Sequence, residues 1–299
     1  MKIFVTGSTG YIGGAVVKEL VQAGHQVTGL FHKPEKEALL KSLGAAGIQG
    51  DLTNVEAWKD QAADHEAILH AGFAQGMEGG AIDRKVVEAL LGAAQAKGVT
   101  QSFIYTSGTW VLGKAGYDPA NESTPTDYPN PIVAWRPAVE QLALQGGSGK
   151  LKTAVIRPGV VYGGKGGLLA GFWDSAVKKG TVTYIGKGEN VWSCVYRGDL
   201  ALLYRLVAEK KATGIFHGVD GAFPQLREVA QAVLRTAGKP GLAQSLPVEE
   251  ARKTMGPFAD ALGDLDQMVW AFRPKELGWK PRYDSFIQGA PQAFKEFTE

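Results

Sequence analysis

Short apolar runs alternate with stretches of helical period along the first half of the chain. The runs of strand length cover residues 2–6, 26–31, 47–49, 67–70, 102–106 and 153–157. The stretches with apolar residues at helical spacing cover residues 11–23, 36–43, 55–61, 80–97 and 131–145. Strands that alternate with helices in this way are typical of βαβ units, whose strands form a parallel sheet. The sequence therefore predicts an α/β fold built on a doubly wound parallel sheet.

The pattern changes after Pro158. The predicted elements that follow are a glycine-rich stretch at 162–167, a helix at 168–179, a strand at 181–185, a helix at 199–209 and a strand at 214–218. From about residue 221 onward the pattern indicates small helices and loops that could cover a cleft. We expect residues 1–165 to form the core and residues 166–299 to form a small C-terminal α/β lobe. Within the lobe, residues 195–220 are expected to return to the core sheet.

Composition limits the class of protein. With 44% hydrophobic residues among 299, the chain can form a large core. The formal net charge is +2 and the basic residues are dispersed, so we expect neither a nucleic-acid partner nor a membrane partner. The N-terminus lacks the features of a signal peptide, and no apolar run reaches the ~18 residues of a membrane span. The single cysteine, Cys194, excludes an internal disulfide and is expected to be buried, which suits a cytoplasmic location.

A glycine-rich turn joins the first predicted strand to the first predicted helix. Glycines in such a turn let backbone N–H groups at the positive end of the helix approach a pyrophosphate. Glycine-rich turns that bind nothing are also common, so the place of this one between a strand and a helix carries the prediction. We expect a Rossmann-type dinucleotide site that includes Gly7, Thr9, Gly10, Tyr11, Ile12 and Gly13.

The residues after the second and third strands bear on the choice of dinucleotide. A site that prefers NAD(H) places an acidic residue after the second strand, where it binds the ribose 2′-hydroxyl. This chain has His32 and Lys33 there, which could meet a 2′-phosphate, so we expect NADP(H) to be preferred over NAD(H). After the third strand, Asp51 could accept from the adenine amino group or cap the following helix, and Leu52 is expected to lie beside it.

Taken in order, these motifs resemble the extended short-chain dehydrogenase/reductase superfamily, in its NAD-dependent epimerase/dehydratase-like branch. The segments that carry the resemblance are residues 5–14, 50–53, 70–72, 103–107, 157–163, 199–201 and 276–281. The resemblance covers nearly the whole chain and implies that the nicotinamide lies across the strand ends near Ser107 and Pro158. It extends the expected cofactor site to Ala71, Gly72, Thr106, Ser107, Arg136, Pro158 and Val160.

In that superfamily the chemistry depends on a Ser or Thr and on a Tyr-x-x-x-Lys pair. The spacing places both side chains on one helical face, where the ammonium lowers the pKa of the phenol so that it can exchange a proton with substrate. None of the nine tyrosines of this chain has a lysine four residues later. When residues 131–145 are matched through Glu140, Ile132 stands at the tyrosine position and Arg136 at the lysine position.

The serine position of the superfamily is also changed. Matching residues 103–113 puts Gly108 where the serine is expected, with Ser107 and Thr109 as its neighbours. Arg136 can still donate to ribose hydroxyls, as the lysine does, but a guanidinium stays charged at neutral pH and releases no proton. The chain therefore resembles the superfamily without its Ser-Tyr-Lys triad.

Two functions follow from these departures. The first is an NADPH-dependent carbonyl or enone reductase of unknown substrate with a non-standard proton donor, for which the catalytic candidates are Ser107, Thr109, Arg136 and Tyr162. Tyr117, Tyr128, water or a residue of the C-terminal lobe are further candidate donors. The second is a non-catalytic NADP(H)-binding redox sensor or scaffold. An isomerase or epimerase needs reversible oxidation, and hence needs the absent base even more.

Several other features bear on the site. The five histidines are scattered without metal-ligand spacing, so no metal is expected. Residues 107–131 form a long loop over the strand ends. We expect Trp135 and Ile132 to fill the space of the missing triad. The tryptophans that could line a substrate cleft are Trp110, Trp135, Trp173 and Trp192.

The helices 80–97 and 131–145 are the pair that builds dimers in the superfamily, and their apolar stripes make a homodimer possible.

Overall fold

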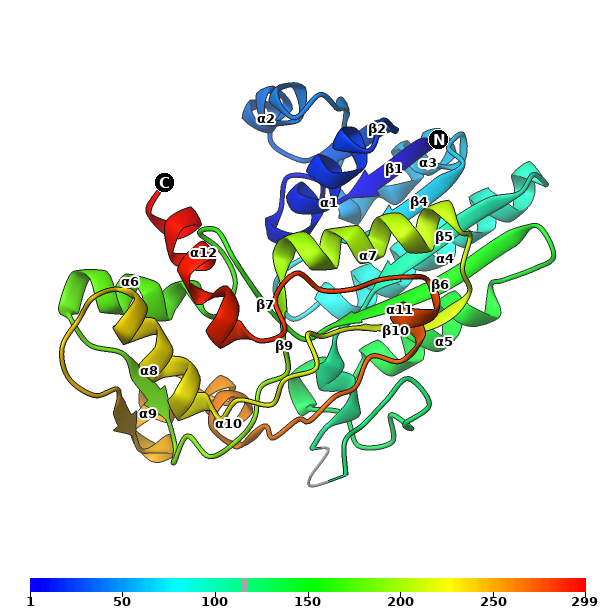
Figure 1. The fold of residues 1–299 in the computed structure, drawn as a ribbon. Coiled ribbons are helices and arrows are strands. Elements are labelled where there is room, and N and C mark those ends of the chain that lie inside the picture. Colours follow the sequence, from blue (N-terminus) through cyan, green and yellow to red (C-terminus); the bar gives the residue numbers. More distant parts are fainter. Residues whose placement is uncertain (115–117) are drawn as a thin grey trace.

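Seven parallel strands form the central sheet. The structure is a computed structural model that describes residues 1–114 and 118–299. The strand order is β10-β6-β5-β4-β1-β2-β3 (Figure 1). The strands are β1 (Lys2–Thr6), β2 (Gln26–Phe31), β3 (Ala46–Gln49), β4 (Ala67–His70), β5 (Gln101–Thr106), β6 (Leu151–Pro158) and β10 (Gly214–Gly218). Because the order reverses beside β1, the connections pass over both faces, which confirms the predicted doubly wound α/β fold.

Helices cover both faces of this sheet. Alternate residues of a strand point to opposite faces, so Ile3 and Val5 pack with α1 (Tyr11–Gln22) and α7 (Arg197–Glu209), whereas Phe4 packs with α4 (Gly79–Lys97) and α5 (Arg136–Gln145). The stripe of α4 that suggested an interface, Val86, Leu90 and Ala94, is buried in that second core, as is Val139 of α5. These stripes therefore pack within the chain.

The predicted helix at 131–145 starts later than expected. A 3₁₀ turn, η4 (Pro131–Val133), precedes α5, which begins at Arg136. Pro137 has no N–H and is tolerated only in the first turn of a helix, so the helix begins immediately before it. Ile132 consequently lies outside α5, and the four-residue spacing from Ile132 to Arg136 does not run along one helix.

Between β2 and β4 the chain also departs from prediction. Residues 55–61 do not form one helix: a 3₁₀ segment, η2 (Leu52–Ala57), is followed by α3 (Lys59–Ala63). Asn54 breaks the helical geometry with φ −124° and ψ 60°. The remaining short elements of the core are η1 (Pro34–Lys36), α2 (Glu37–Ser42), η3 (Thr109–Leu112) and α11 (Arg273–Glu276).

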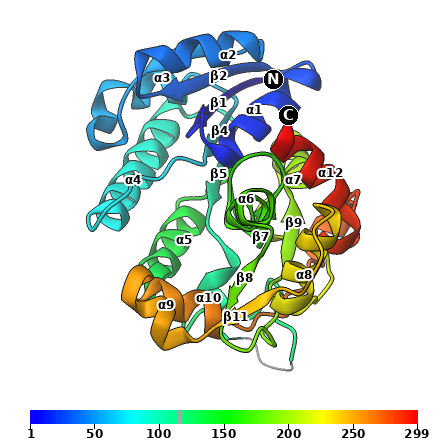
Figure 2. The ribbon, with the colours of Figure 1, turned by 90° about the vertical axis from the view of Figure 1, so that its left-hand side faces the viewer.

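A smaller set of elements packs at one end of the sheet (Figure 2). Its two small sheets pair β7 (Val160–Tyr162) with β9 (Cys194–Tyr196) and β8 (Thr183–Ile185) with β11 (Gln244–Leu246). Its helices are α6 (Ala170–Lys179), α8 (Leu226–Thr236), α9 (Val248–Met255), α10 (Phe258–Asp264) and α12 (Phe286–Thr298). They share a separate apolar core that includes Trp173 and Cys194.

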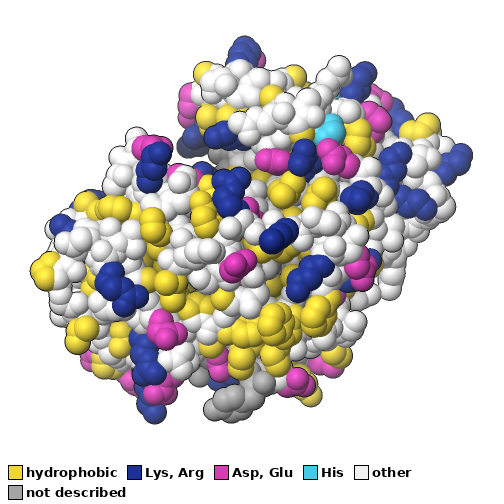
Figure 3. All heavy atoms as spheres, in the orientation of Figure 1, with side chains coloured by type: hydrophobic (Ala, Val, Ile, Leu, Met, Phe, Trp, Pro, Cys, Tyr) yellow, Lys and Arg dark blue, Asp and Glu magenta, His cyan; other side chains and the backbone are white. Residues whose placement is uncertain are grey.

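The surface mixes both signs of charge. On the face drawn in Figure 3, basic and acidic side chains are interspersed with hydrophobic ones. Within the described ranges, no helix is both long enough and apolar enough to cross a bilayer.

Candidate functional site

The turn between β1 and α1 is held by close backbone contacts. Gly7 has a φ of +62°, and a Cβ added there would lie 2.6 Å from the carbonyl oxygen of Ala71. A Cβ on Gly13 would lie 2.1 Å from the carbonyl oxygen of Gly7. Gly10 is the N-cap of α1 and provides no side-chain hydrogen bond. The N–H groups of the first helical turn are therefore left for a ligand.

A cavity of about 350 Å³ opens on one side of the glycine turn. Its lining residues are Gly7, Thr9, Leu30, His32, Gly50, Asp51, Leu52, Thr53, Gly72, Phe73 and Ala74. Residues predicted from three separate segments, after β1, β2 and β3, thus meet in one place. The carboxyl ends of parallel strands meet at one edge of a sheet, which is where the doubly wound fold places ligands.

Asp51 and His32 form an ion pair in this cavity. The Asp51 carboxylate lies 2.7 Å from Nδ1 of His32, whose side chain is 67% exposed. Asp51 also caps η2 by accepting hydrogen bonds of 2.7 Å from the backbone N–H and the hydroxyl of Thr53. These bonds, first that of the hydroxyl, and the nearby imidazole lower the pKa of Asp51. The capping role is therefore established by geometry. Lys33 is exposed at the N-cap of η1.

A second cavity, of about 280 Å³, lies on the other side of the glycine turn. Its lining residues are Tyr11, Ile12, Ser107, Gly108, Thr109, Trp110, Val133, Arg136, Pro158, Gly159, Val160, Val161, Gly167 and Leu168. Ser107 is 8% exposed, and its hydroxyl oxygen is buried with no hydrogen-bond partner among the described residues. Thr109 is 2% exposed. The predicted residues at the ends of β5 and β6 are therefore brought together here.

Arg136 is fixed at the wall of the second cavity. Its guanidinium donates a hydrogen bond of 2.8 Å to the carbonyl oxygen of Thr106. It also lies 4.6 Å from the ring centroid of Trp135 and 5.4 Å from that of Phe73. These two rings are stacked, with centroids 5.5 Å apart and planes 7° apart. The stack limits the orientations of a cation that otherwise has several free donors.

The side chain of Tyr11 packs between the glycine turn and the C-terminal elements and contacts both. Its hydroxyl donates to the carbonyl oxygen of Gly163 at 2.8 Å. Its ring packs so closely on the glycine-rich segment that a Cβ on Gly166 would lie 2.4 Å from it, and one on Gly167 2.8 Å from it. Burial raises the pKa of Tyr11, so its phenol stays protonated at neutral pH.

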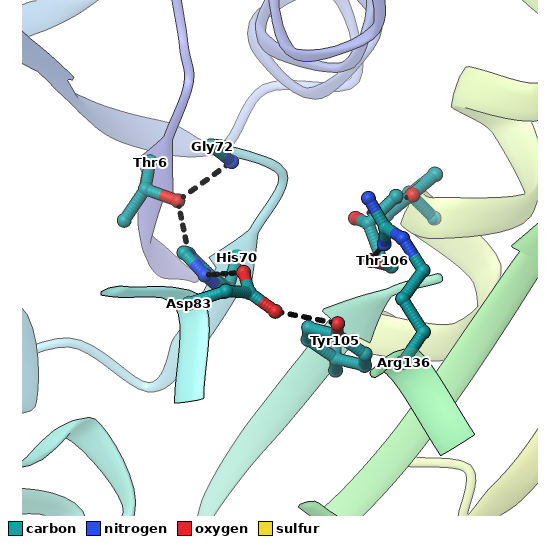
Figure 4. Close-up of polar contacts among 8 residues, drawn as sticks. Thr6, His70, Gly72, Asp83, Tyr105, Thr106 and Arg136 are labelled. Carbon is teal, nitrogen blue, oxygen red and sulfur yellow. Dashed lines mark hydrogen bonds and ion pairs between the residues drawn. The ribbon is translucent and has the colours of Figure 1, made fainter. Parts of the chain in front are cut away.

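A chain of buried polar side chains connects β1, β4, α4 and β5 (Figure 4). The hydroxyl of Thr6 lies 2.6 Å from Nδ1 of His70, and Nε2 of His70 lies 3.0 Å from Asp83. The Tyr105 hydroxyl donates to the other oxygen of Asp83 at 2.6 Å. Thr6 also accepts from the backbone N–H of Gly72 at 3.1 Å. The chain thereby fixes the start of the loop that contacts the glycine turn.

The sequence analysis missed Asp83 and Tyr105. The available signal was an aspartate in the apolar stripe of α4, one turn before Val86 and Val87. A carboxylate at a buried helical position needs hydrogen-bond donors, and His70 was the nearest candidate at the end of a predicted strand. Asp83 is only 3% exposed, and it obtains those donors from two neighbouring strands.

A second buried network anchors α5. The Glu140 carboxylate accepts hydrogen bonds from Arg157 on β6, at 3.0 Å from Nε to one oxygen and 2.5 Å from the terminal nitrogen to the other. His217 on β10 lies 3.5 Å from the same guanidinium. Burial, and then the charge of Arg157, lower the pKa of His217 to about 3. This network sets the position of α5, and with it that of Arg136.

Some predicted residues lie elsewhere. Tyr162 does not line the second cavity: its ring packs against Phe286, its hydroxyl is 3.4 Å from the carbonyl oxygen of Ser285, and burial raises its pKa. Tyr128 is 88% exposed. Tyr117 lies outside the described residues.

Of the four tryptophans, Trp110 alone is among the described residues that line the second cavity. Trp173 and Trp192 are buried in the core of the C-terminal elements. Trp135 stacks on Phe73, which lines the first cavity, so it does not fill the predicted space in the second. Ile132 is 38% exposed, so it does not fill the space as predicted, because it precedes α5. Over residues 1–114 and 118–299, no cluster of three potential metal ligands occurs.

Comparison with known proteins agrees with this architecture. The profile of the NAD dependent epimerase/dehydratase family matches residues 3–217. An uncharacterized protein of Saccharomyces cerevisiae is 33% identical, over 96% of this chain and 97% of its own length. A 2-alkyl-3-oxoalkanoate reductase of Stenotrophomonas maltophilia is 26% identical, over 89% of this chain and 84% of its own. The crystal structure of a human epimerase family protein with NADPH has the same fold, with a TM-score of 0.81 at 19% identity, covering 99% of this chain and 100% of that one.

Proposed function

Because the chain belongs to the NAD dependent epimerase/dehydratase family, we propose that it binds NADP(H) and reduces a carbonyl or enone acceptor without the Ser-Tyr-Lys triad of that superfamily. One observation carries the proposal. The residues of the glycine turn contribute to two cavities, whose linings include several of the residues predicted for the two ends of a dinucleotide.

The residues present fit a dinucleotide. Side chains at Gly7 and Gly13 would collide with the backbone, so the approach to the helix N-terminus stays open only with glycine. The unpartnered hydroxyl of Ser107 leaves a donor in the second cavity for a bound group. The residues that would hold the cofactor are Gly7, Thr9, Gly10, Tyr11, Ile12, Gly13, His32, Lys33, Asp51, Leu52, Ala71, Gly72, Thr106, Ser107, Arg136, Pro158 and Val160. When bound, the reduced nicotinamide supplies a hydride to an acceptor carbon.

The preference for NADP(H) rests on the end of β2. His32 lines the first cavity and Lys33 follows it, whereas no acidic residue occupies the position that would bind a ribose 2′-hydroxyl. His32 is held toward the cavity by Asp51, at 2.7 Å. The cationic side chain of Lys33 at this point favours a 2′-phosphate over a hydroxyl.

Reduction is favoured over epimerisation by the residues that match the triad positions in sequence. In that match, Gly108 and Ile132 stand at the positions of the catalytic serine and tyrosine, and Arg136 stands at that of the lysine. Epimerisation needs a base to start an oxidation, whereas reduction needs only hydride, a positioned acceptor and a proton from any source. The related 2-alkyl-3-oxoalkanoate reductase, 26% identical, supports a carbonyl acceptor.

The test has two steps. Melting temperatures are measured with NADPH, NADP⁺, NADH and NAD⁺, and consumption of the best reduced nucleotide is then followed with a panel of ketones and enones. A ligand at 100 times its dissociation constant adds ~2.7 kcal/mol of stability, so NADPH should give a clear upward shift. Four nucleotides without effect at millimolar concentration would overturn the proposal.

The second candidate is a non-catalytic NADP(H) sensor. Among the described residues that line the second cavity, Arg136 is the one formally charged side chain, and it releases no proton. The hydrogen bond from Tyr11 to Gly163 links the glycine turn to the C-terminal elements, so a conformational change on nucleotide binding would be transmitted to those elements. A sensor would bind NADPH, show no turnover with the panel, and differ in protease sensitivity between NADP⁺ and NADPH. Turnover that persists with equal protease sensitivity would reject it.

A further inference from the structure

Part of the wall of the second cavity is apolar. Trp110, Val133 and Leu168 belong to it, and Val160 and Val161 line it from β7. Trp110 is backed by Phe258, whose ring centroid is 6.1 Å away. Burying apolar surface against such a wall is favourable, and its aliphatic side chains provide no hydrogen bonds for the hydroxyl groups of a sugar.

Hydrogen-bond donors of Ser107 and Arg136 lie in this cavity beside the end of β5. The buried hydroxyl of Ser107 has no partner, and Arg136 uses one of its donors on the carbonyl oxygen of Thr106 at 2.8 Å. A guanidinium has five N–H donors, so others are free for a bound oxygen. Both residues follow or face the end of β5, beside Pro158 at the end of β6.

The size of the cavity restricts its contents. A volume of about 280 Å³ has to hold the nicotinamide ring as well as the acceptor. This is below the ~300–1,000 Å³ of sites that enclose a drug-sized molecule. A nucleotide-linked sugar would have to extend beyond this cavity.

We propose that the substrate is a small, uncharged ketone with an apolar body, whose carbonyl oxygen is held by Ser107 and Arg136 while the body packs against Trp110, Val133 and Leu168. This inference rests on the proposed function and gives its substrate class. An acceptor that also has a carboxylate on its body is disfavoured: Arg136, which faces the carbonyl oxygen, is the one charged side chain among the described residues of the lining, so the carboxylate would be buried without a partner.

The reaction balances with NADPH and water. The carbonyl carbon gains the hydride, the π electron pair moves to the oxygen, and the oxygen takes a proton from water, which leaves an alcohol, NADP⁺ and hydroxide. Ser107 and Arg136 donate hydrogen bonds to the oxygen as its charge grows, which stabilises the transition state more than the ground state. No phenol is required in this sequence.

A matched pair of unreactive ligands tests the inference apart from turnover. Cyclohexanecarboxamide has a neutral carbonyl on an apolar ring, and 4-carbamoylcyclohexane-1-carboxylate has the same ring and amide with a carboxylate at the far end of the ring. Binding of each to the NADPH-loaded protein is measured by titration calorimetry, and NADPH consumption is followed with cyclohexanone. We expect the amide to bind at least about tenfold tighter than the carboxylate, which corresponds to about 1.4 kcal/mol.

Variants identify the oxygen site. In protein saturated with NADPH, Ser107→Ala should weaken the amide about tenfold, since a lost hydrogen bond to a neutral partner is worth ~0.5–1.5 kcal/mol. Ser102→Ala is the matched control: Ser102 lies on β5, the strand that Ser107 follows, its hydroxyl is also buried without a partner, and it does not line the cavity. It should leave the affinities for the amide and for NADPH unchanged.

The outcomes separate the two proposals. If NADPH does not bind, the proposed function fails. If NADPH binds but the carboxylate is preferred, or if Ser107→Ala and Ser102→Ala behave alike, the proposed function stands and the substrate class is wrong. Trp110→Ala should weaken binding of the amide and leave NADPH affinity unchanged. An unchanged affinity for the amide would show that Trp110 does not contact the bound ligand.

Discussion

The two walls of the predicted cofactor channel differ in how tightly they are determined. On the wall of β1 and α1, glycines touch backbone at distances that exclude a Cβ, and the polar chain of Thr6, His70, Asp83 and Tyr105 is linked throughout by hydrogen bonds. On the opposite wall, Ser107 has no partner, and a Cβ on Gly108 would meet only the carbonyl oxygen of Pro158 at 3.8 Å. Larger side chains are therefore excluded from the first, closed wall, whereas the second, open wall has space for them.

This difference separates binding from chemistry. A diphosphate is recognised by backbone geometry, which few sequences satisfy, so the residues of the glycine turn are fixed by sterics. The opposite wall has only to place donors and apolar surface near an acceptor, and several residue types can do that. A member of the superfamily can therefore change its reactive residues without disturbing its nucleotide site.

The largest effect should come from filling the closed wall. Gly13→Val places a side chain where even a Cβ would be 2.1 Å from the Gly7 carbonyl oxygen. We expect NADPH affinity to fall at least about 100-fold, or about 2.7 kcal/mol, as measured by fluorescence titration. Gly14→Ala is the control, because its Cβ would be 3.6 Å from the nearest atom, an ordinary contact. Equal affinity of the two variants would show that the turn does not hold the diphosphate.

The polar chain should matter more to stability than the opposite wall. Asp83→Asn replaces one of two acceptor oxygens with a donor, so Tyr105 or His70 loses its partner in a buried site. We expect the free energy of unfolding in urea to fall by about 1–3 kcal/mol. Arg136→Met, on the open wall, should lower it by about 1 kcal/mol or less. A larger loss for Arg136→Met would reverse the comparison.

The stability that the network of Glu140, Arg157 and His217 contributes should depend on pH. His217 takes up a proton near pH 6.5 when unfolded, but its pKa in the folded state is about 3. The unfolded state therefore binds more protons below pH 6.5, and stability falls as the pH falls toward 3, by up to about 1.4 kcal/mol per unit. In His217→Asn this contribution is absent, so unfolding free energies measured from pH 7.5 to 5 should show a shallower decline. Parallel curves would contradict the assignment.

Cofactor choice should depend on the end of β2. The double substitution of His32 and Lys33 by Ala should weaken NADPH about tenfold, or about 1.4 kcal/mol, and leave NADH unchanged, because only the former carries a 2′-phosphate. Lys36→Ala, an exposed lysine of η1, serves as the control for lost charge. Equal losses for both nucleotides would place these residues outside the selectivity site.

The smallest effect is expected where the open wall has room. Gly108 has an extended backbone with φ −175°. Gly108→Ser should therefore change the free energy of unfolding by no more than about 0.5 kcal/mol, because no backbone strain or collision opposes it. NADPH affinity should stay within about twofold. A loss of several kcal/mol would show that this wall is as closely packed as the glycine turn.

Local rules account for what could be predicted. The periods of apolar residues gave the strands and helices of the core, and the glycines between a strand and a helix indicated the nucleotide turn. The start of α5 and the break at Asn54 were missed, because proline and turn geometry override the apolar pattern at element ends. Tyr162 was a plausible donor by chemistry, yet it lies against Phe286.

The sequence by itself determined the order of elements and the family, since both depend on patterns among neighbours along the chain. Only the tertiary structure decided that Asp83 joins His70 to Tyr105, that Tyr11 binds the glycine-rich segment, and that Ser107 is left without a partner. Those contacts join residues far apart in the chain, and a hydrogen bond depends on distances of a few tenths of an ångström that no local pattern contains.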